Sequence, residues 1–180
     1  MSLLSRIDGS DIYFLDVKNK VDHRGGFCKI FQESWFTENF NFTPKECYFS
    51  TSNKNVLRGF HLQINESSQG KIVSCISGKV LDVVVDLRKS SKTYGKHFKI
   101  ILSEKNGKHL FVPRGFAHGI LGLDKENILH YACSNYRDSK SEVSIKWNDI
   151  ELKINWGVKK PIISKKDKFA LSFKEYKKIK

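Results

Sequence analysis

The chain has 180 residues, 39% of them hydrophobic and 13 of them phenylalanine, which predicts one folded domain over residues 1–180 and excludes a disordered chain. Its 32 lysines and arginines outnumber 19 acidic residues, and the net charge of +13 fits either an anionic partner or a solvated lysine-rich surface. The 4 cysteines form no CxxC pair, the N-terminus does not have the pattern of a signal peptide, and no apolar run approaches a membrane span, so we expect a cytoplasmic protein with free thiols and no membrane partner.

Short β-like segments separated by turn residues follow one another along the first third of the chain. The pattern predicts strands over residues 11–18 and 27–32 on either side of an HRGG turn, and a short helix over residues 33–40. It then predicts two strands, 46–52 and 55–63, that pair through a two-residue turn.

The same pattern continues through the rest of the chain. We expect further strands, with tight turns at 77–79 and 104–108, over residues 71–76, 80–88, 97–103, 109–113, 127–136 and 141–148. Residues 167–178, near the C-terminus, favour a short helix. Many short strands with little helix between them predict an antiparallel jelly-roll barrel, mainly β, with short helices and a ligand in its mouth.

One predicted strand is polar on one side only. In VLDVVVDL, residues 80–87, every second residue is apolar, while the alternate positions include Asp82 and Asp86. One side of this strand therefore faces a core, and the other presents carboxylates to a polar site.

Several polar residues interrupt apolar strands: Arg58, His61, Lys71, Asp82, His118 and Tyr131. Each alone has an ordinary structural explanation. As a set, a base, a phenol and two cations suit proton abstraction next to a carbonyl, because histidine is a good base near neutral pH and a cation stabilises the enolate oxygen. A phenol on the opposite face could return the proton and invert the carbon.

The stretch NVLRGFHLQ, residues 55–63, places Arg58 and His61 at an odd spacing. A regular strand would direct these two side chains to opposite faces. We expect Gly59 to permit a bulge that brings both into one pocket.

A metal site is the alternative for the histidines. The segment GFHLQ has no second histidine two residues on, and the remaining histidines are scattered. We therefore expect no metal and no other cofactor.

Six longer motifs follow one another between about residues 22 and 167: DHRGGF, NVLRGFHLQ, QGKIVSCISGKVLDVVVDLRKSSKTYGK, VPRGFAHGI, HYACSNY and IKWNDIELKINW. In this order they together resemble the dTDP-4-dehydrorhamnose 3,5-epimerase family, the metal-free cupins of nucleotide-sugar biosynthesis. The resemblance implies a cytoplasmic homodimer that epimerises C3, C5 or both in a nucleotide-linked 4-keto sugar. Its substrate would come from a dehydratase or oxidase and go on to a reductase.

The resemblance also implies roles for single residues. His61 looks like the general base, Tyr131 like the acid on the opposite face, and Lys71 like the cation at the enolate oxygen, with Arg58 near it. The remaining catalytic positions are Asp167, which would orient His61, and the second histidine, His118. The implied substrate-binding residues are Arg24, which would contact the diphosphate, Lys29, Glu46, Tyr48, Gln63, Asp82, which could orient His118, and Arg137.

Three segments differ from the family pattern where the nucleotide would lie. Lys29 replaces a usual glutamate, Glu46 and Tyr48 replace Gln-x-Asn, and Arg137 ends NYR where the family has NYY. These changes favour a GDP-linked 4-keto heptose, as in related enzymes of capsule pathways, over the thymidine-linked hexose, which stays the alternative.

Other functions remain to be distinguished. A non-catalytic nucleotide-sugar-binding cupin would need to have lost His61, Lys71 or Tyr131, and all three are present. A 3,4-ketoisomerase of nucleotide sugars shares the barrel but not this motif set. A nucleic-acid binder would need interleaved basic and aromatic residues on one strand face, whereas the lysines here are dispersed, so we expect no nucleic-acid partner.

Overall fold

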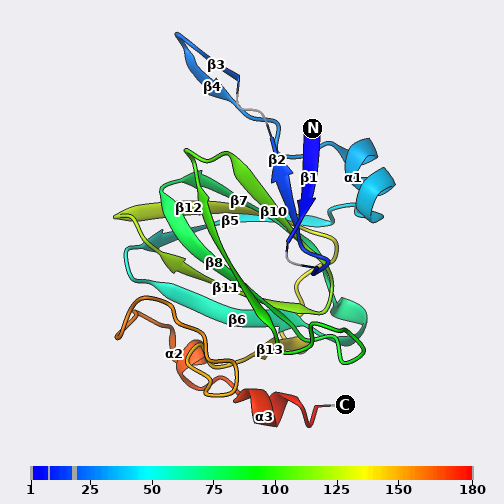
Figure 1. Ribbon diagram of the computed structural model, residues 1–180, viewed down its shortest axis with the longest axis vertical. Helices are drawn as coiled ribbons and strands as arrows, with labels where there is room; N and C mark the ends of the chain where they lie inside the picture. The colour runs from blue at the N-terminus through cyan, green and yellow to red at the C-terminus, as the bar shows by residue number, and fades with distance from the viewer. Residues whose placement is uncertain (1, 8, 18–19, 180) are drawn as a thin grey trace.

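The computed structural model describes residues 2–7, 9–17 and 20–179, and it consists mainly of two antiparallel sheets that face each other (Figure 1). The six-stranded sheet has the order β1 (Ser2–Arg6), β2 (Tyr13–Asp16), β10 (Lys108–Val112), β7 (Lys71–Ser77), β12 (Glu126–Cys133) and β5 (Glu46–Asn53). The five-stranded sheet has the order β13 (Glu142–Ser144), β6 (Leu57–Gln63), β11 (Phe116–Gly122), β8 (Lys79–Asp86) and β9 (His97–Ser103). This is the antiparallel jelly roll that the strand spacing predicted.

The remaining elements are short. A two-stranded hairpin of β3 (Lys20–Asp22) and β4 (Gly25–Phe27) projects from the barrel, at the top of Figure 1. The helices are α1 (Glu33–Phe40), the 3-10 turn η1 (Asn65–Ser67), α2 (Lys165–Lys168) and α3 (Phe173–Tyr176). No helix in the described ranges is long and apolar enough to cross a membrane.

Three apolar clusters hold the sheets in place. The first fills the barrel between the sheets and includes Val73, Val84 and Leu129. The second lies on the outer face of the five-stranded sheet, where residues of the C-terminal segment such as Trp156 cover Val83. The third packs the aromatic side chains of α1 on the six-stranded sheet. Strand β8 is therefore buried on both faces, and its Asp82 side faces the barrel interior, as its alternation predicted.

Sheet membership corrects two of the predicted strand pairings. Residues 46–52 and 55–63 do form strands, but β5 and β6 lie in different sheets and do not pair with each other. The same holds for β9 and β10, which flank the predicted hairpin turn at 104–108. In a jelly roll the chain crosses between sheets at such turns, and the alternation of side chains does not reveal the partner strand.

Local structure also differs from the prediction in several places. Residues 28–32 have no regular structure, because Phe31 stacks on Phe36 of α1 instead of joining a sheet. Strands β1, β3, β4 and β11 were not expected; β11 is buried throughout and shows no alternation. The predicted C-terminal helix is two short helices, because Leu171 between them donates its backbone N–H to Ser144 and extends the edge at β13. The predicted helix at 33–40 coincides with α1, and the prediction that residues 141–148 extend a sheet is confirmed by β13.

Gly59 produces the predicted bulge in β6. In the β6–β11 ladder His61 lies opposite His118 and Arg58 lies opposite Ile120, so three residue steps on β6 face two on β11. Gly59 has a φ of +125°, in the region that favours glycine. The bulge turns Arg58 and His61 to the same side of the sheet, where both line one pocket.

We expect Gly59→Ala to lower the free energy of unfolding by about 3 kcal/mol or more. The added Cβ would lie 2.5 Å from the Gly119 Cα and 2.8 Å from the His118 carbonyl oxygen, and neither backbone atom can turn away. Urea unfolding followed by circular dichroism measures the change. Gly157→Ala is the matched control: Gly157 has a φ of +75° with nothing within 4 Å of its Cβ position, so a loss of about 1 kcal/mol is expected. Equal losses in the two variants would contradict the close approach at the bulge.

Candidate active site

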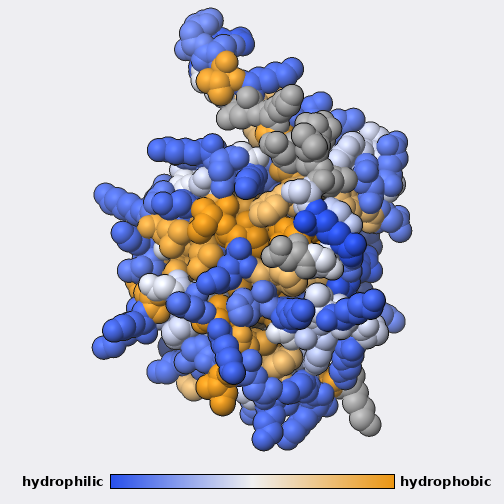
Figure 2. Space-filling model, viewed as in Figure 1, coloured by the Kyte–Doolittle hydropathy of each residue, from blue (hydrophilic) through white to orange (hydrophobic). Residues whose placement is uncertain are grey.

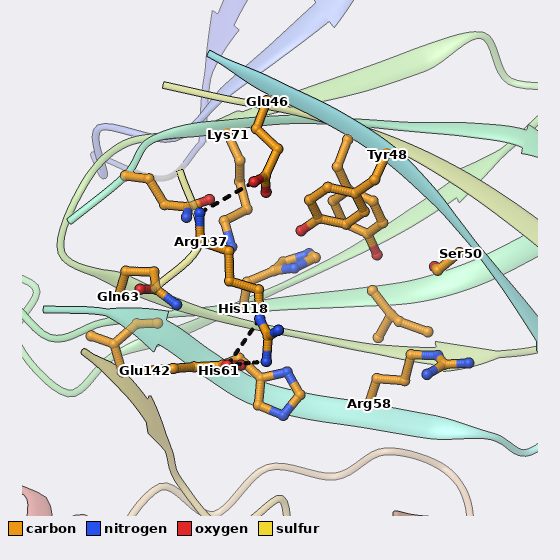
Figure 3. A pocket seen from close by; sticks show the side chains of 14 residues that line it. Glu46, Tyr48, Ser50, Arg58, His61, Gln63, Lys71, His118, Arg137 and Glu142 are labelled. Carbon is orange, nitrogen blue, oxygen red and sulfur yellow. Dashed lines mark hydrogen bonds and ion pairs between the residues drawn. The ribbon is translucent and has the colours of Figure 1, made fainter. Parts of the chain in front are cut away.

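A pocket of about 220 Å³ opens between the two sheets (Figure 3). Its first wall is the five-stranded sheet, which contributes Arg58, His61 and His118. Its second wall is the six-stranded sheet, which contributes Lys71 and Tyr131. The other lining residues are Glu46, Tyr48, Ser50, Leu62, Gln63, Gln69, Ile120, Arg137 and Glu142. The volume is below the roughly 300–1,000 Å³ of pockets for whole drug-sized ligands, so it suits a sugar-sized group with the rest of a ligand at the mouth.

His61 is held by a carboxylate from the far end of the chain. Its Nε2–H donates to Asp167 Oδ1 at 2.6 Å, and Asp167 also accepts from the Ser164 hydroxyl at 2.9 Å. Ser164 caps α2, so the helix fixes the position of the carboxylate. Burial by itself raises the pKa of Asp167, but the hydrogen bonds from His61 and Ser164 lower it below its ordinary value. The ionised carboxylate fixes the imidazole tautomer and leaves Nδ1 as the nitrogen that can accept a proton.

The opposite wall presents a phenol that retains its proton. Tyr131 is 6% exposed and stacks on Tyr48 with ring centroids 4.9 Å apart. Burial, reinforced by the negative charge of Asp82, raises the pKa of the Tyr131 phenol well above its ordinary value. At neutral pH the phenol is therefore protonated and can act as an acid.

Lys71 lies deep in the same wall. Its side chain is 9% exposed, and burial lowers the pKa of its ammonium group, while the nearby Cys133 and Asp82 act in the opposite direction. A lysine with a lowered pKa gives up a proton more easily than a surface lysine. It is therefore suited to stabilise or protonate an oxygen that gains negative charge.

A second histidine–carboxylate pair lies beside the first histidine. His118 Nε2–H donates to Asp82 Oδ2 at 2.7 Å, and the His118 ring meets the edge of Tyr131 at a centroid distance of 6.0 Å. Asp82 is fully buried, and its second oxygen has no hydrogen-bond partner among the described residues. Arg58 is anchored at the other side by donating to the Ser52 hydroxyl and the Thr51 carbonyl, both at 2.9 Å.

The structure places the predicted residues in three groups. Nine line the pocket: Arg58, His61, Lys71, His118, Tyr131, Glu46, Tyr48, Gln63 and Arg137. Asp167 and Asp82 lie behind the two histidines and pair with them, so Asp82 does not itself line the pocket. Arg24 and Lys29 lie outside this pocket; Arg24 is on the projecting hairpin and pairs with Asp22.

Of the lining residues that the sequence did not predict, Leu62 and Ile120 are apolar and Ser50, Gln69 and Glu142 are polar. Ser50 has a buried hydroxyl beside the Tyr131 phenol, and it shares the inward parity of Glu46 and Tyr48 on β5, which could have identified it. Gln69 lies two positions before Lys71 and has the same parity. Glu142 gave no local signal, because it enters the pocket only through the pairing of β13 with Gln63 on β6.

Together these groups supply what enolisation needs. A base with a fixed tautomer faces a protonated phenol across the pocket, and a buried cation lies on the same wall as the phenol. No three His, Cys, Asp or Glu side chains in the described part of the chain are grouped as a metal site.

Comparisons with known proteins agree with this arrangement. The family model described as dTDP-4-dehydrorhamnose 3,5-epimerase matches residues 7–175. The chain is 40% identical over 163 residues to dTDP-4-dehydrorhamnose 3,5-epimerase of Salmonella typhimurium, with 89% of each chain covered. The crystal structure of dTDP-4-dehydrorhamnose 3,5-epimerase from Elizabethkingia anophelis is similar with a TM-score of 0.89 at 38% identity, covering 96% of this chain and 97% of that one. The dTDP-6-deoxy-D-glucose-3,5-epimerase from Legionella pneumophila, in complex with dTDP-4-keto-L-rhamnose, has a TM-score of 0.89 at 35% identity, covering 94% and 92%.

The lowered pKa of Asp167 predicts a pH-dependent contribution to stability. A carboxylate whose folded pKa is depressed stabilises the protein above its unfolded pKa, near 3.9, and this contribution is lost as the pH falls through the lower folded value. We expect Asp167→Asn to lower the free energy of unfolding by about 1–2 kcal/mol at neutral pH, and the difference to shrink below about pH 4. Urea unfolding at several pH values measures it. Asp124→Asn, at an exposed site whose ion pair with Lys79 is 4.0 Å long, should change little at any pH. If Asp167→Asn lowers the free energy of unfolding by the same amount at every pH, the lowered pKa of Asp167 is contradicted.

Proposed function

Since the chain belongs to the dTDP-4-dehydrorhamnose 3,5-epimerase family of isomerases, we propose that it inverts both C3 and C5 of a thymidine-diphosphate-linked 4-keto sugar in nucleotide-sugar biosynthesis. The observation that carries the proposal is the position of His61 and Tyr131 on opposite walls of one pocket. A sugar ring held between the sheets presents one face to each of them. Removal of a proton on one face and its return on the other is what inversion requires.

Each inversion is a balanced proton exchange. His61 Nδ1 takes the proton from the carbon next to the C4 ketone, and the electron pair of the broken C–H bond moves into the enolate. Lys71 stabilises the enolate oxygen. The Tyr131 phenol then donates its proton to the carbon from the opposite face, and solvent restores both residues to their starting protonation states. Asp167 supports the imidazolium that forms in the first step.

The comparisons favour thymidine over guanosine as the carrier. The family model and the three compared relatives are all named for thymidine-linked sugars. A GDP-linked 4-keto heptose is the second candidate, and Glu46, Tyr48 and Arg137 at the pocket are the observation in its favour. Lys29, the fourth departure from the family pattern, lies outside the pocket of its own chain.

A homodimer would explain the projecting hairpin. All six residues of β3 and β4 are exposed, including Val21 at 73% and Phe27 at 62%. In Figure 2 the hairpin at the top carries hydrophobic side chains among hydrophilic ones, away from the rest of the chain. Burying such side chains on a second copy is favourable. The hairpin would then bring Arg24 to the diphosphate of the neighbouring site.

The proposed chemistry is tested by deuterium uptake into dTDP- and GDP-linked 4-keto sugars in D₂O, measured by mass spectrometry. Two deuterons in one substrate are expected, at C3 and C5. His61→Asn should lower uptake by about a thousandfold, because no other base replaces it. Tyr131→Phe should keep uptake within about tenfold of the original but lower inversion by about a hundredfold or more, because the enolate still forms and takes back a deuteron on the original face from His61, which exchanges its proton with D₂O.

Different results separate the alternatives. One deuteron would indicate inversion at a single carbon. Uptake with the GDP-linked heptose alone would establish the second candidate. Near-normal uptake by His61→Asn would refute the base assignment, and no uptake by the folded protein with any of these sugars would refute the proposed reaction.

The homodimer is tested by mixing two inactive or weakened variants. If Arg24 acts in the neighbouring site, a mixed dimer of His61→Asn and Arg24→Ala contains one site with both His61 and Arg24. Activity should therefore rise on mixing, after exchange of subunits, to about half of the original per mixed dimer. Light scattering of the unmixed protein gives the mass in solution. A dimeric mass with no recovery on mixing would show that Arg24 does not act across the interface, and a monomeric mass would refute the dimer.

A further inference from the structure

Arg137 extends across the pocket from one carboxylate to another (Figure 3). Its backbone N–H donates to Glu46 Oε2 at 3.3 Å. Its guanidinium donates to Glu142 Oε2 from Nη2 at 2.7 Å and from Nε at 3.1 Å. The side chain thus lies at the solvent-exposed side of the pocket that it lines.

Glu142 has a second cation that does not depend on Arg137. Lys166 Nζ lies 2.6 Å from Glu142 Oε1, the oxygen that Arg137 does not use. Burial by itself raises the pKa of Glu142, but Lys166 and Arg137 lower it below its ordinary value. If Arg137 moved away, this 9% exposed carboxylate would therefore keep a partner, and no unpaired buried charge would be left.

The bond between Arg137 and Glu142 is of a kind that is easily exchanged. The Arg137 side chain is 59% exposed, and ion pairs with an exposed partner contribute little to stability. A phosphate group accepts two parallel hydrogen bonds from a guanidinium on two oxygens, whereas both bonds from Arg137 end on one oxygen of Glu142.

The other cations that line the pocket are less free to move. Arg58 donates to Ser52 and to the backbone of Thr51. Lys71 is 9% exposed at the base of the pocket. Among the described lining residues, Arg137 is thus the cation that is both near the entrance and able to change its partner.

We propose that Arg137 is a movable ligand for the diphosphate of the sugar nucleotide. Its guanidinium exchanges Glu142 for a phosphate oxygen when the diphosphate binds, and Lys166 keeps Glu142 paired. This deepens the proposed function and rests on its substrate being a nucleoside diphosphate. It also gives a physical reason for an arginine in the NYR segment: the exchange needs a cation that a tyrosine cannot supply.

The affinities for dTDP and GDP, measured by isothermal titration calorimetry, test the ligand. Arg137→Ala should weaken the binding of whichever diphosphate the original protein prefers by about ten- to a hundredfold. Arg137→Lys keeps the positive charge but not the forked guanidinium, so its affinity should lie between those of the original protein and Arg137→Ala. The matched control is Arg6→Ala, because Arg6 is 53% exposed, pairs with Asp11 and lies outside the pocket; affinity should stay within about twofold. Equal affinities of the original protein and Arg137→Ala would overturn the proposal, as would binding of neither nucleotide by the original protein.

A double-mutant cycle tests the exchange itself. Glu142→Gln removes the competing carboxylate, so it should tighten diphosphate binding by about three- to tenfold when Arg137 is present. In the Arg137→Ala background the same change should have an effect of less than about twofold. An equal gain in both backgrounds would mean that Glu142 only repels the ligand, and the proposed change of partner would be wrong.

The binding assay and the deuterium assay fail independently. If the protein takes up no deuterium but binds the diphosphate through Arg137, the proposed reaction is wrong and this inference stands. If it takes up two deuterons but binds the diphosphate equally well without Arg137, the reaction stands and the inference is wrong.

Discussion

The close contact between β6 and β11 at Gly59 and Gly119 is the constraint on which the pocket depends. A side chain on Gly59 would meet the Gly119 backbone, and one on Gly119 would lie 3.1 Å from the Arg58 carbonyl oxygen. Only two glycines let the strands approach closely enough for β6 to bulge while the ladder continues on both sides. The bulge in turn places Arg58 and His61 on one wall. The facing wall then needs only a regular alternation, which β12 and β7 supply with Tyr131 and Lys71.

The parts of the structure that depend on local sequence were predictable. The alternation of short strands identified the barrel, and the odd spacing of Arg58 and His61 around Gly59 identified the bulge. Strand pairing was not predictable, because β5 and β6 are neighbours in sequence but belong to opposite sheets. Residues that enter the pocket through long-range pairing could not be found either. Glu142 is such a residue, since nothing in its own segment shows that β13 joins β6.

The positive charge of the chain and the chemistry of its pocket concern different residues. The net charge of +13 resides largely in dispersed lysines, whereas the pocket combines Lys71, Arg58 and Arg137 with Glu46 and Glu142. A surplus of surface lysines raises the local concentration of a doubly charged diphosphate and increases its association rate, more so at low ionic strength. Selection among sugars then falls to the few groups inside the pocket, where charges are nearly balanced and solvent is limited.

The carboxylate that orients His61 comes from a segment 106 residues farther along the chain. During synthesis, the strands that form both walls of the barrel leave the ribosome well before Asp167 does. A barrel could therefore assemble with its base still lacking a partner, and the C-terminal segment, by docking on the outer face of the five-stranded sheet, would complete the site last. For the same reason, proteolysis between β13 and α2 would remove the orientation of His61 while leaving most of the interior packing in place.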